Sequence, residues 1–289
     1  MAARPRTLPA AIAPVLVGTA AAVYATDADR FRLGAFVAAL IGSVFIQIGT
    51  NLANDYSDAR RGADAVDRLG PVRVTAAGLV APRRVLVATW LAFAVAVACG
   101  AYLTAIAGPL ILVVGVLSIA AGVLYTGGPR PYGYEGLGEA FVFLFFGLVA
   151  VNGSYFVQLE RLDWLPFGLS VAVGLLSAAI LVVNNVRDID TDRRAGKRTL
   201  AVRLGRDRTR ALYRAFLAGA ALALVLTLAL NGGPWAALLG LLAAPIAARV
   251  AATVARASDG PSLNQALAGT GAVLGVFSLL VSLGLLLAS

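Results

Sequence analysis

Long apolar runs, each about the length that crosses a bilayer, occupy most of the chain. A spanning helix needs about 20 consecutive, mostly apolar residues. Nine runs meet this criterion, at residues 8–25, 33–55, 84–106, 108–126, 137–158, 165–186, 210–230, 233–254 and 264–287. Glycine and proline make short turns between some of them, at residues 108–109 and 231–234. The pattern predicts an all-α, polytopic membrane protein with nine spans, built as one domain over residues 1–289.

A polar stripe ends the second apolar run. Its members recur every three or four residues and share one helical face, which comprises Gln47, Asn51, Asn54, Asp55 and Asp58. Asp64 and Asp67 follow. A carboxylate at the centre of a spanning helix costs about 2.5–3.5 kcal/mol, so ionisable residues at membrane depth are functional candidates by default. A solvated helix end is the alternative explanation, but it does not explain why Gln47 and Asn51 lie inside the apolar run.

The sixth apolar run ends in a second polar stripe. Asn184 or Asn185, Asp188 and Asp192 have helical spacing there. Two facing stripes would line a central cavity open to the cytoplasm. Carboxylates this close repel one another unless cations balance their charge. The chain has no histidine and one cysteine, which excludes a Cys/His metal site and favours a hard cation held by oxygen atoms, Mg²⁺ above all.

Composition and charge support the membrane assignment. Hydrophobic residues make up 60% of the chain and charged residues 13%, whereas a soluble domain is roughly 45–50% apolar and 25% charged. When the loops are assigned to alternating sides, all but Arg30, Arg32 and Arg161 of the 24 Arg and Lys residues fall on one side. This bias places that side, with both acidic stripes, in the cytoplasm. It also explains the net charge of +9 without nucleic acid as a partner.

Basic residues near the stripes favour a phosphate-bearing ligand. Mg²⁺ usually combines one or two carboxylates with water and substrate phosphate oxygens, and Arg and Lys are the usual phosphate partners. Lys197, the one lysine, and Arg73 are the favoured candidates, while Arg130 and Arg187 also lie near the stripes. Most other arginines are explained by topology or by lipid headgroups. The pattern therefore favours a site in which two or more Mg²⁺ ions bind a diphosphate.

Aromatic residues flank the loop between the fourth and fifth runs. Tyr125, Tyr132 and Tyr134 lie there, on the same side as the stripes. A tyrosine ring shelters a cation through its π face, or its phenol binds an aromatic substrate. An interfacial aromatic belt is the alternative. Glu139, near the cytoplasmic end of the fifth run, is a candidate for orienting a basic residue or binding substrate.

Taken in order, these motifs resemble the UbiA superfamily of intramembrane prenyltransferases. The resemblance covers nearly the whole chain and implies one UbiA-like domain over residues 1–289. It rests on the ordered segments 4–9 (RPRTLP), 49–56 (GTNLANDY), 60–64 (RRGAD), 70–75 (GPVRVT), 125–134 (YTGGPRPYGY), 136–139 (GLGE) and 184–200. An ordered set of this kind is far more specific than an isolated Asp-x-x-x-Asp.

The resemblance also implies metal ligands, position by position. The superfamily's first motif is usually Asn-Asp-x-x-Asp-x-x-x-Asp, but Gly62 stands at its last position here and the acid follows at Asp64. The second is often Asp-x-x-Asp-x-x-x-Asp, and Asn185 replaces its first acid. Both departures are typical of the members that prenylate 1,4-dihydroxy-2-naphthoate. The implied Mg²⁺ ligands are Asn54, Asp55, Asp58, Asp64, Asp188 and Asp192.

The implied activity is Mg²⁺-dependent transfer of a polyprenyl group from a polyprenyl diphosphate to 1,4-dihydroxy-2-naphthoate. Loss of CO₂ and pyrophosphate would give demethylmenaquinone, in a bacterial cell membrane and with the site facing the cytoplasm. The implied catalytic residues are Asp58, Asp188, Lys197 and Tyr125. The implied substrate-binding residues are Gln47, Asn51, Arg73, Arg130, Tyr132, Asn184, Asn185, Arg187 and Lys197.

Two other functions stay open at this point. One is a UbiA-type enzyme with a different aromatic acceptor, such as 4-hydroxybenzoate; the Asp64 spacing and the start at residues 4–9 argue against it. The other is a divalent-cation transporter. Transport sites tend to lie near the bilayer midplane on broken helices, whereas both polar stripes end at one side of the membrane.

Overall fold

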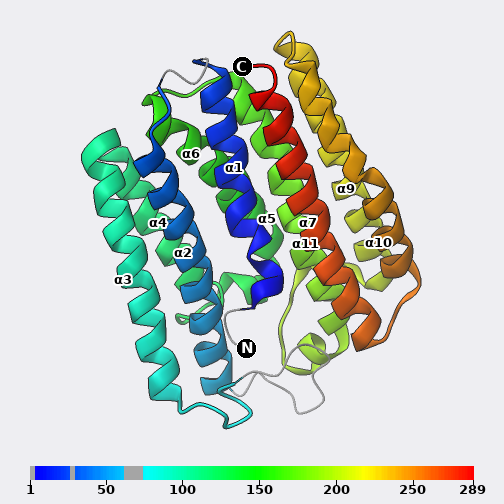
Figure 1. Cartoon of the computed structure of the whole chain (residues 1–289). Coiled ribbons are helices and arrows are strands. Elements are labelled where there is room, and N and C mark those ends of the chain that lie inside the picture. The colour runs from blue at the N-terminus through cyan, green and yellow to red at the C-terminus, as the bar shows by residue number, and fades with distance from the viewer. Residues whose placement is uncertain (1–3, 27–29, 62–73) are drawn as a thin grey trace.

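The computed structural model describes residues 4–26, 30–61 and 74–289, and every regular element among them is helical (Figure 1). The α-helices are α1 (Pro9–Tyr24), α2 (Leu33–Arg60), α3 (Pro82–Ala107), α4 (Leu110–Leu124), α5 (Gly138–Val142), α6 (Ala150–Leu159), α7 (Trp164–Arg194), α8 (Leu200–Leu204), α9 (Arg206–Leu230), α10 (Ala244–Arg256) and α11 (Gly260–Leu286). Short 3₁₀ segments are η1 (Pro5–Thr7), η2 (Tyr132–Glu135) and η4 (Trp235–Ala243), and η3 (Phe143–Val149) is π-helical. The predicted all-α class is confirmed.

The described helices include eight that are long and apolar enough to cross a membrane. Eight of the nine predicted runs correspond to them. The run predicted at 108–126 forms α4, which has only 15 residues. At about 1.5 Å per residue, α4 is roughly 22 Å long, short of the roughly 30 Å hydrocarbon core. Pro109 precedes the helix, and Gly127 and Gly128 follow soon after it ends, which limits its length. The prediction of nine spans is therefore not confirmed.

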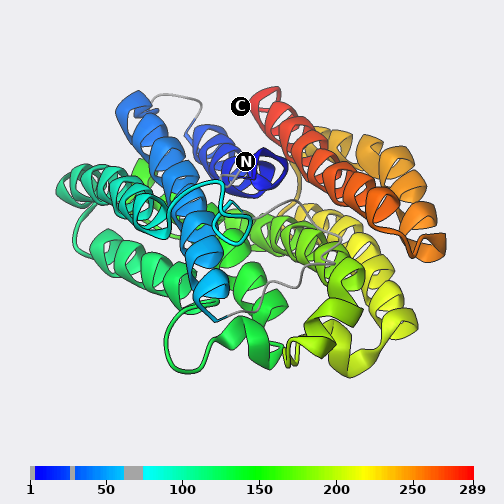
Figure 2. The ribbon, with the colours of Figure 1, turned by 90° about the horizontal axis from the view of Figure 1, so that it is seen from below.

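The core of the bundle is built around α7, whose apolar window is the most buried of the candidate spans. α7 packs against α9, α11 and η3, while α1 packs against α11 and α6. Seen from below, the early helices α2–α4 lie on one side of the bundle and α9–α11 on the other (Figure 2). The C-terminal ends of α2 and α7 lie at the same, lower end in Figure 1, so both polar stripes are brought to one end of the bundle.

Two close helix contacts shape the middle of the bundle. A Cβ atom on Gly147 of η3 would lie 2.6 Å from the Cα of Gly174 on α7, so two glycines let these helices touch. A Cβ on Gly122 of α4 would lie 2.2 Å from Oγ1 of Thr50 on α2. The obstacle at Gly147 would be backbone, so glycine is required there for the helices to approach this closely, whereas at Gly122 the Thr50 hydroxyl would have to move. Gly122 and Thr50, which form the second contact, both line the cavity described next.

Candidate active site

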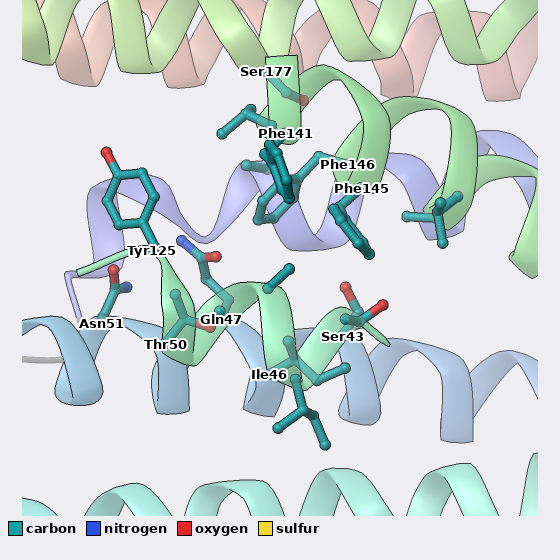
Figure 3. A pocket seen from close by; sticks show the side chains of 18 of the residues that line it. Ser43, Ile46, Gln47, Thr50, Asn51, Tyr125, Phe141, Phe145, Phe146 and Ser177 are labelled. Carbon is teal, nitrogen blue, oxygen red and sulfur yellow. The ribbon is translucent and has the colours of Figure 1, made fainter. Parts of the chain in front are cut away.

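A cavity of about 460 Å³ lies among α2, α3, α4, α7 and the segment that links α4 to α6. Its walls are mostly apolar, with a polar end where α2 and α7 approach their C-terminal ends. In Figure 3, Gln47, Thr50 and Asn51 of α2 face the cavity from one side, while Phe141 and Phe145 face it from the other. Such a shape suits a ligand with one charged end and a long apolar remainder.

The stripe on α2 lines the polar end, and neighbouring elements hold its side chains in place. The predicted residues Gln47, Asn51, Asn54 and Asp58 all contribute to the cavity wall. Thr7 of η1 accepts hydrogen bonds from Gln47 Nε2 at 3.1 Å and from Asn51 Nδ2 at 3.4 Å. The hydroxyl of Thr126 donates to Asn54 Oδ1 at 2.9 Å. The start of the chain and the end of α4 therefore fix the amide groups of this stripe.

Asp58 is the meeting point of both stripes. The phenol of Tyr134 donates a hydrogen bond to its Oδ1 atom. Nζ of Lys197 lies 3.6 Å from its Oδ2 atom, 3.9 Å from Asp192 Oδ1 and 4.7 Å from the centre of the Tyr134 ring. All four residues line the cavity. One ammonium group thus connects the carboxylates of two sequence motifs.

The turn that ends α7 accounts for the position of Lys197. Gly196 has a φ of +72°, a left-handed conformation that glycine adopts without strain. The Lys197 N–H donates to Asp192 O at 2.9 Å, and the Gly196 N–H donates to Arg193 O at 3.2 Å. This pair of bonds is a Schellman motif, which closes a helix and reverses the chain. The reversal returns Lys197 to the face that carries Asp192.

On α7, Arg187 grips Asp188 with two hydrogen bonds. Arg187 Nε donates to Asp188 Oδ1 at 2.8 Å and Nη2 donates to Oδ2 at 2.6 Å. The guanidinium also donates to Asn184 Oδ1 and to Asn264 Oδ1, both at 2.8 Å. Asn184 and Asp188 line the cavity, whereas Arg187 does not and its side chain is 1% exposed. Arg187 therefore orients the acid beside it, and its predicted role in substrate binding stays a prediction.

A buried acid, Glu139, holds the side-chain amide of Asn185. The Nδ2 atom of Asn185 donates to Glu139 Oε1 of α5 at 2.8 Å. Asn185 lines the cavity, but Glu139 does not. Both side chains are buried.

Several predicted residues lie away from the cavity. Asp55 points to the backbone instead: its carboxylate accepts hydrogen bonds from the N–H groups of Val74 and Thr75, at 3.2 and 3.4 Å. Arg130 has a side chain that is 83% exposed and pairs with Glu135 at 3.4 Å. Asp64 and Arg73 lie outside the described residues, so their predicted roles stay predictions.

The donors at the polar end are suited to a hard cation. Asn54, Asp58, Asp188 and Asp192 offer oxygen atoms to one cavity, and oxygen is what Mg²⁺ prefers. Within residues 4–26, 30–61 and 74–289, no group of three or more His, Cys, Asp or Glu side chains is close enough to hold a metal ion. The fit is therefore to a cation that takes one or two carboxylates and completes its shell with water and phosphate.

An aromatic wall adjoins the polar end. Tyr125 and Tyr132 meet edge to face with ring centres 5.5 Å apart, and Tyr132 stacks on Phe141 at 4.0 Å. Phe141 in turn stacks on Phe145 at 6.1 Å. The Tyr132 phenol donates to Ala121 O at 2.9 Å, and burial raises the pKa of Tyr132 above its ordinary value. This phenol is consequently neutral at physiological pH.

Sequence reasoning did not identify several residues that shape the site. Thr7 lies in the segment 4–9 that carries the resemblance, but nothing there indicated that its hydroxyl holds Gln47 and Asn51. Thr126 directly follows Tyr125, which was a candidate site residue, but the sequence did not indicate a role for Thr126 itself. The sequence did not indicate a role for Asn264, because a single polar residue near the start of an apolar helix usually marks a solvated helix end. Its contact with Arg187 arises only when α11 packs on α7.

Comparison with known proteins bears on both fold and chemistry. The UbiA prenyltransferase family matches residues 11–273. A protein of Mycobacterium tuberculosis named 1,4-dihydroxy-2-naphthoate octaprenyltransferase is 47% identical over 97% of this chain and 94% of its own length. The apo structure of a UbiA homolog from Aeropyrum pernix K1 covers 97% of both chains with a TM-score of 0.72 at 18% identity. A UbiA homolog from Archaeoglobus fulgidus, bound to GPP and Mg²⁺, covers 97% of both with a TM-score of 0.66 at 13% identity.

Proposed function

Because the chain belongs to the UbiA prenyltransferase family, we propose that it transfers a polyprenyl group from a polyprenyl diphosphate to 1,4-dihydroxy-2-naphthoate. The reaction releases pyrophosphate and CO₂ and forms demethylmenaquinol, the hydroquinone form of demethylmenaquinone, in a step of menaquinone biosynthesis. The name and near full-length identity of the mycobacterial relative support the acceptor. The observation that carries the proposal is the joining of both polar stripes by Lys197 in one cavity with an aromatic wall.

In this proposal, the diphosphate lies at the polar end. Asn54, Asp58, Asp188 and Asp192 would hold Mg²⁺, which would neutralise the diphosphate and favour cleavage of the allylic C–O bond. The A. fulgidus homolog, bound to GPP and Mg²⁺, supports this combination. Lys197 donates hydrogen bonds to phosphate oxygens and stabilises the charge that develops on the leaving group. Arg187 keeps Asp188 in a single orientation.

The prenyl group and the acceptor occupy the apolar remainder of the cavity. When the C–O bond breaks, its electron pair leaves with pyrophosphate and the prenyl C1 becomes an allylic cation. The faces of Tyr125, Tyr132 and Phe141 stabilise this cation electrostatically. The ring carbon that bears the carboxylate forms the new C–C bond, and loss of CO₂ returns an electron pair to the ring. Because the phenol of Tyr132 is neutral, it is not a phenolate that the allylic cation would alkylate.

The proposed setting is the bacterial plasma membrane, with the polar end facing the cytoplasm. The chain has several apolar helices that are long enough to cross a membrane, so it is a multi-pass membrane protein. The Arg and Lys bias toward the ends of α2 and α7 supports the orientation. A polyprenyl tail is soluble in the bilayer, so entry from the membrane avoids water.

An acceptor screen tests the proposal. Purified protein with Mg²⁺ and a polyprenyl diphosphate should release pyrophosphate and form a prenylated product with 1,4-dihydroxy-2-naphthoate. The same reaction with 4-hydroxybenzoate measures the alternative acceptor. Product with the naphthoate alone supports the proposal, and product with the benzoate alone overturns it.

A further inference from the structure

Glu139 is a buried acid that the mechanism above does not use. Its Oε1 atom accepts a hydrogen bond from Asn185 Nδ2 at 2.8 Å. Its Oε2 atom is buried and has no hydrogen-bond partner among the described residues. A half-satisfied buried carboxylate is costly, so its presence beside the cavity calls for a functional explanation.

The contact determines which end of the Asn185 amide faces the cavity. A carboxylate only accepts hydrogen bonds, whereas an amide has one donor end and one acceptor end. Glu139 therefore selects the NH₂ end of Asn185, and the carbonyl oxygen is left for the cavity that Asn185 lines. Asn185 Oδ1 makes no hydrogen bond to the protein among the described residues, so it is available to a ligand.

The position of Asn185 on α7 indicates which ligand its carbonyl oxygen would contact. Asn185 precedes Asp188 by three residues and Asp192 by seven, so the three side chains follow one another along one helical face. All three line the cavity. The carbonyl oxygen of Asn185 thus extends the row of oxygen atoms that the proposed function assigns to Mg²⁺ and diphosphate.

We propose that Glu139 is a positioning residue that turns the Asn185 carbonyl oxygen toward the Mg²⁺-bound diphosphate. This inference rests on the proposed function. Glu139 does not line the cavity, whereas the neutral amide of Asn185 does and presents its oxygen there. An acid at position 185 beside Glu139 would put two carboxylates in buried contact, where like charges repel.

The test measures ligand binding rather than turnover. The probe is farnesyl S-thiolodiphosphate, whose C–S bond resists cleavage, titrated calorimetrically into the full-length protein in nanodiscs over a series of Mg²⁺ concentrations. Glu139→Gln keeps the shape but offers Asn185 either a donor or an acceptor, so both amide orientations become populated. We expect Mg²⁺-dependent binding to weaken by about tenfold, a typical effect of changing a group that orients a metal ligand.

The double variant makes the test specific. Asn185→Asp alone should weaken binding more than Glu139→Gln does, because two carboxylates then meet. In Glu139→Gln/Asn185→Asp, the amide introduced at position 139 donates to the acid introduced at position 185, and binding should return to within about threefold of wild type, since the orienting hydrogen bond is restored. Where Asn185→Asp does not fold, recovery of folded protein in the double variant supports the pairing. Glu160→Gln, which removes an acid that pairs with Arg32 at the other end of the bundle, is the matched control.

The outcomes separate this inference from the proposed function. If wild-type protein does not bind the probe at any Mg²⁺ concentration, the proposed function fails. If wild type binds, but Glu139→Gln binds equally well or the folded double variant binds no better than Asn185→Asp, the positioning role is overturned.

Discussion

The ammonium of Lys197 lies 3.6 Å from the Oδ2 atom of Asp58, although the two residues belong to different polar stripes. The side chain of Lys197 is about nine-tenths buried, so water screens its charge only weakly. The lysine therefore keeps the carboxylates of α2 and α7 together at the polar end of the cavity.

Lys197→Gln should lower kcat/KM for the polyprenyl diphosphate by about 100-fold, because one preorganised donor to the leaving group is lost. Initial rates of pyrophosphate release over a range of donor concentrations measure this. Arg198→Gln is the matched control: Arg198 is the next residue along the chain and its side chain is exposed. Equal activity of Lys197→Gln and wild type would remove Lys197 from the mechanism.

Asp188→Ala should destabilise the protein as well as abolish turnover. The guanidinium of Arg187 then stays buried without its carboxylate, which costs about 3–5 kcal/mol. Thermal unfolding in nanodiscs should show a lower Tm. In Asp190→Ala the lost partner of Arg206 is an exposed acid, so the change should be about 1 kcal/mol or less. Similar Tm values for both variants would contradict the buried-pair argument.

Asp55 and Asp58 should respond differently to replacement by asparagine. Asp58→Asn removes a carboxylate from the cavity and should greatly weaken Mg²⁺-dependent binding of the thiolodiphosphate probe. Asp55→Asn should reduce binding only a few-fold but release the backbone at Val74 and Thr75, whose N–H groups it holds.

Hydrogen exchange separates these two roles. The amides of Val74 and Thr75 should exchange faster in Asp55→Asn and remain protected in Asp58→Asn. If Asp55→Asn abolished Mg²⁺-dependent binding and left the two amides protected, Asp55 would be a metal ligand, as the motif implies.

Tyr132 should make the stability of the protein fall at alkaline pH. Burial raises its pKa in the folded state, so the unfolded chain loses the phenol proton first, near the ordinary value of about 10. The contribution of Tyr132 to the free energy of unfolding is fully present below about pH 10. It is lost as the pH rises from there toward the pKa of Tyr132 in the folded state. Tm measured between pH 8 and 11 should decline less steeply in Tyr132→Phe than in wild type. Parallel curves would refute the assignment.

Much of the fold follows from hydropathy, because apolar length is a local property of the chain. Eight predicted runs correspond to helices of spanning length. What hydropathy could not reveal is backbone geometry within a run. The fifth run contains the π-helical segment Phe143–Val149, and the eighth begins as the 3₁₀ segment Trp235–Ala243. Apolar composition is similar in all these helix types, so the distinction depends on tertiary contacts such as that of Gly147 with Gly174.

The site was predictable to the extent that it follows helical spacing. Gln47, Asn51, Asn54 and Asp58 line one cavity, as intervals of three and four residues indicate. Asp55 was assigned to the same stripe, but its neighbouring position on the helix directs it to the backbone at residues 74–75. Partners from distant segments, such as Asn264 for Arg187, depend on helix packing and have no local signal.

The wall formed by Tyr125, Tyr132, Phe141 and Phe145 bears on the fidelity of the reaction. Water persists in a cavity only where several polar groups bind it, and stacked rings supply few. A cation formed beside this wall is therefore shielded on one side from capture by solvent. We therefore expect the rings to limit the loss of polyprenyl diphosphate as free alcohol while the acceptor is absent.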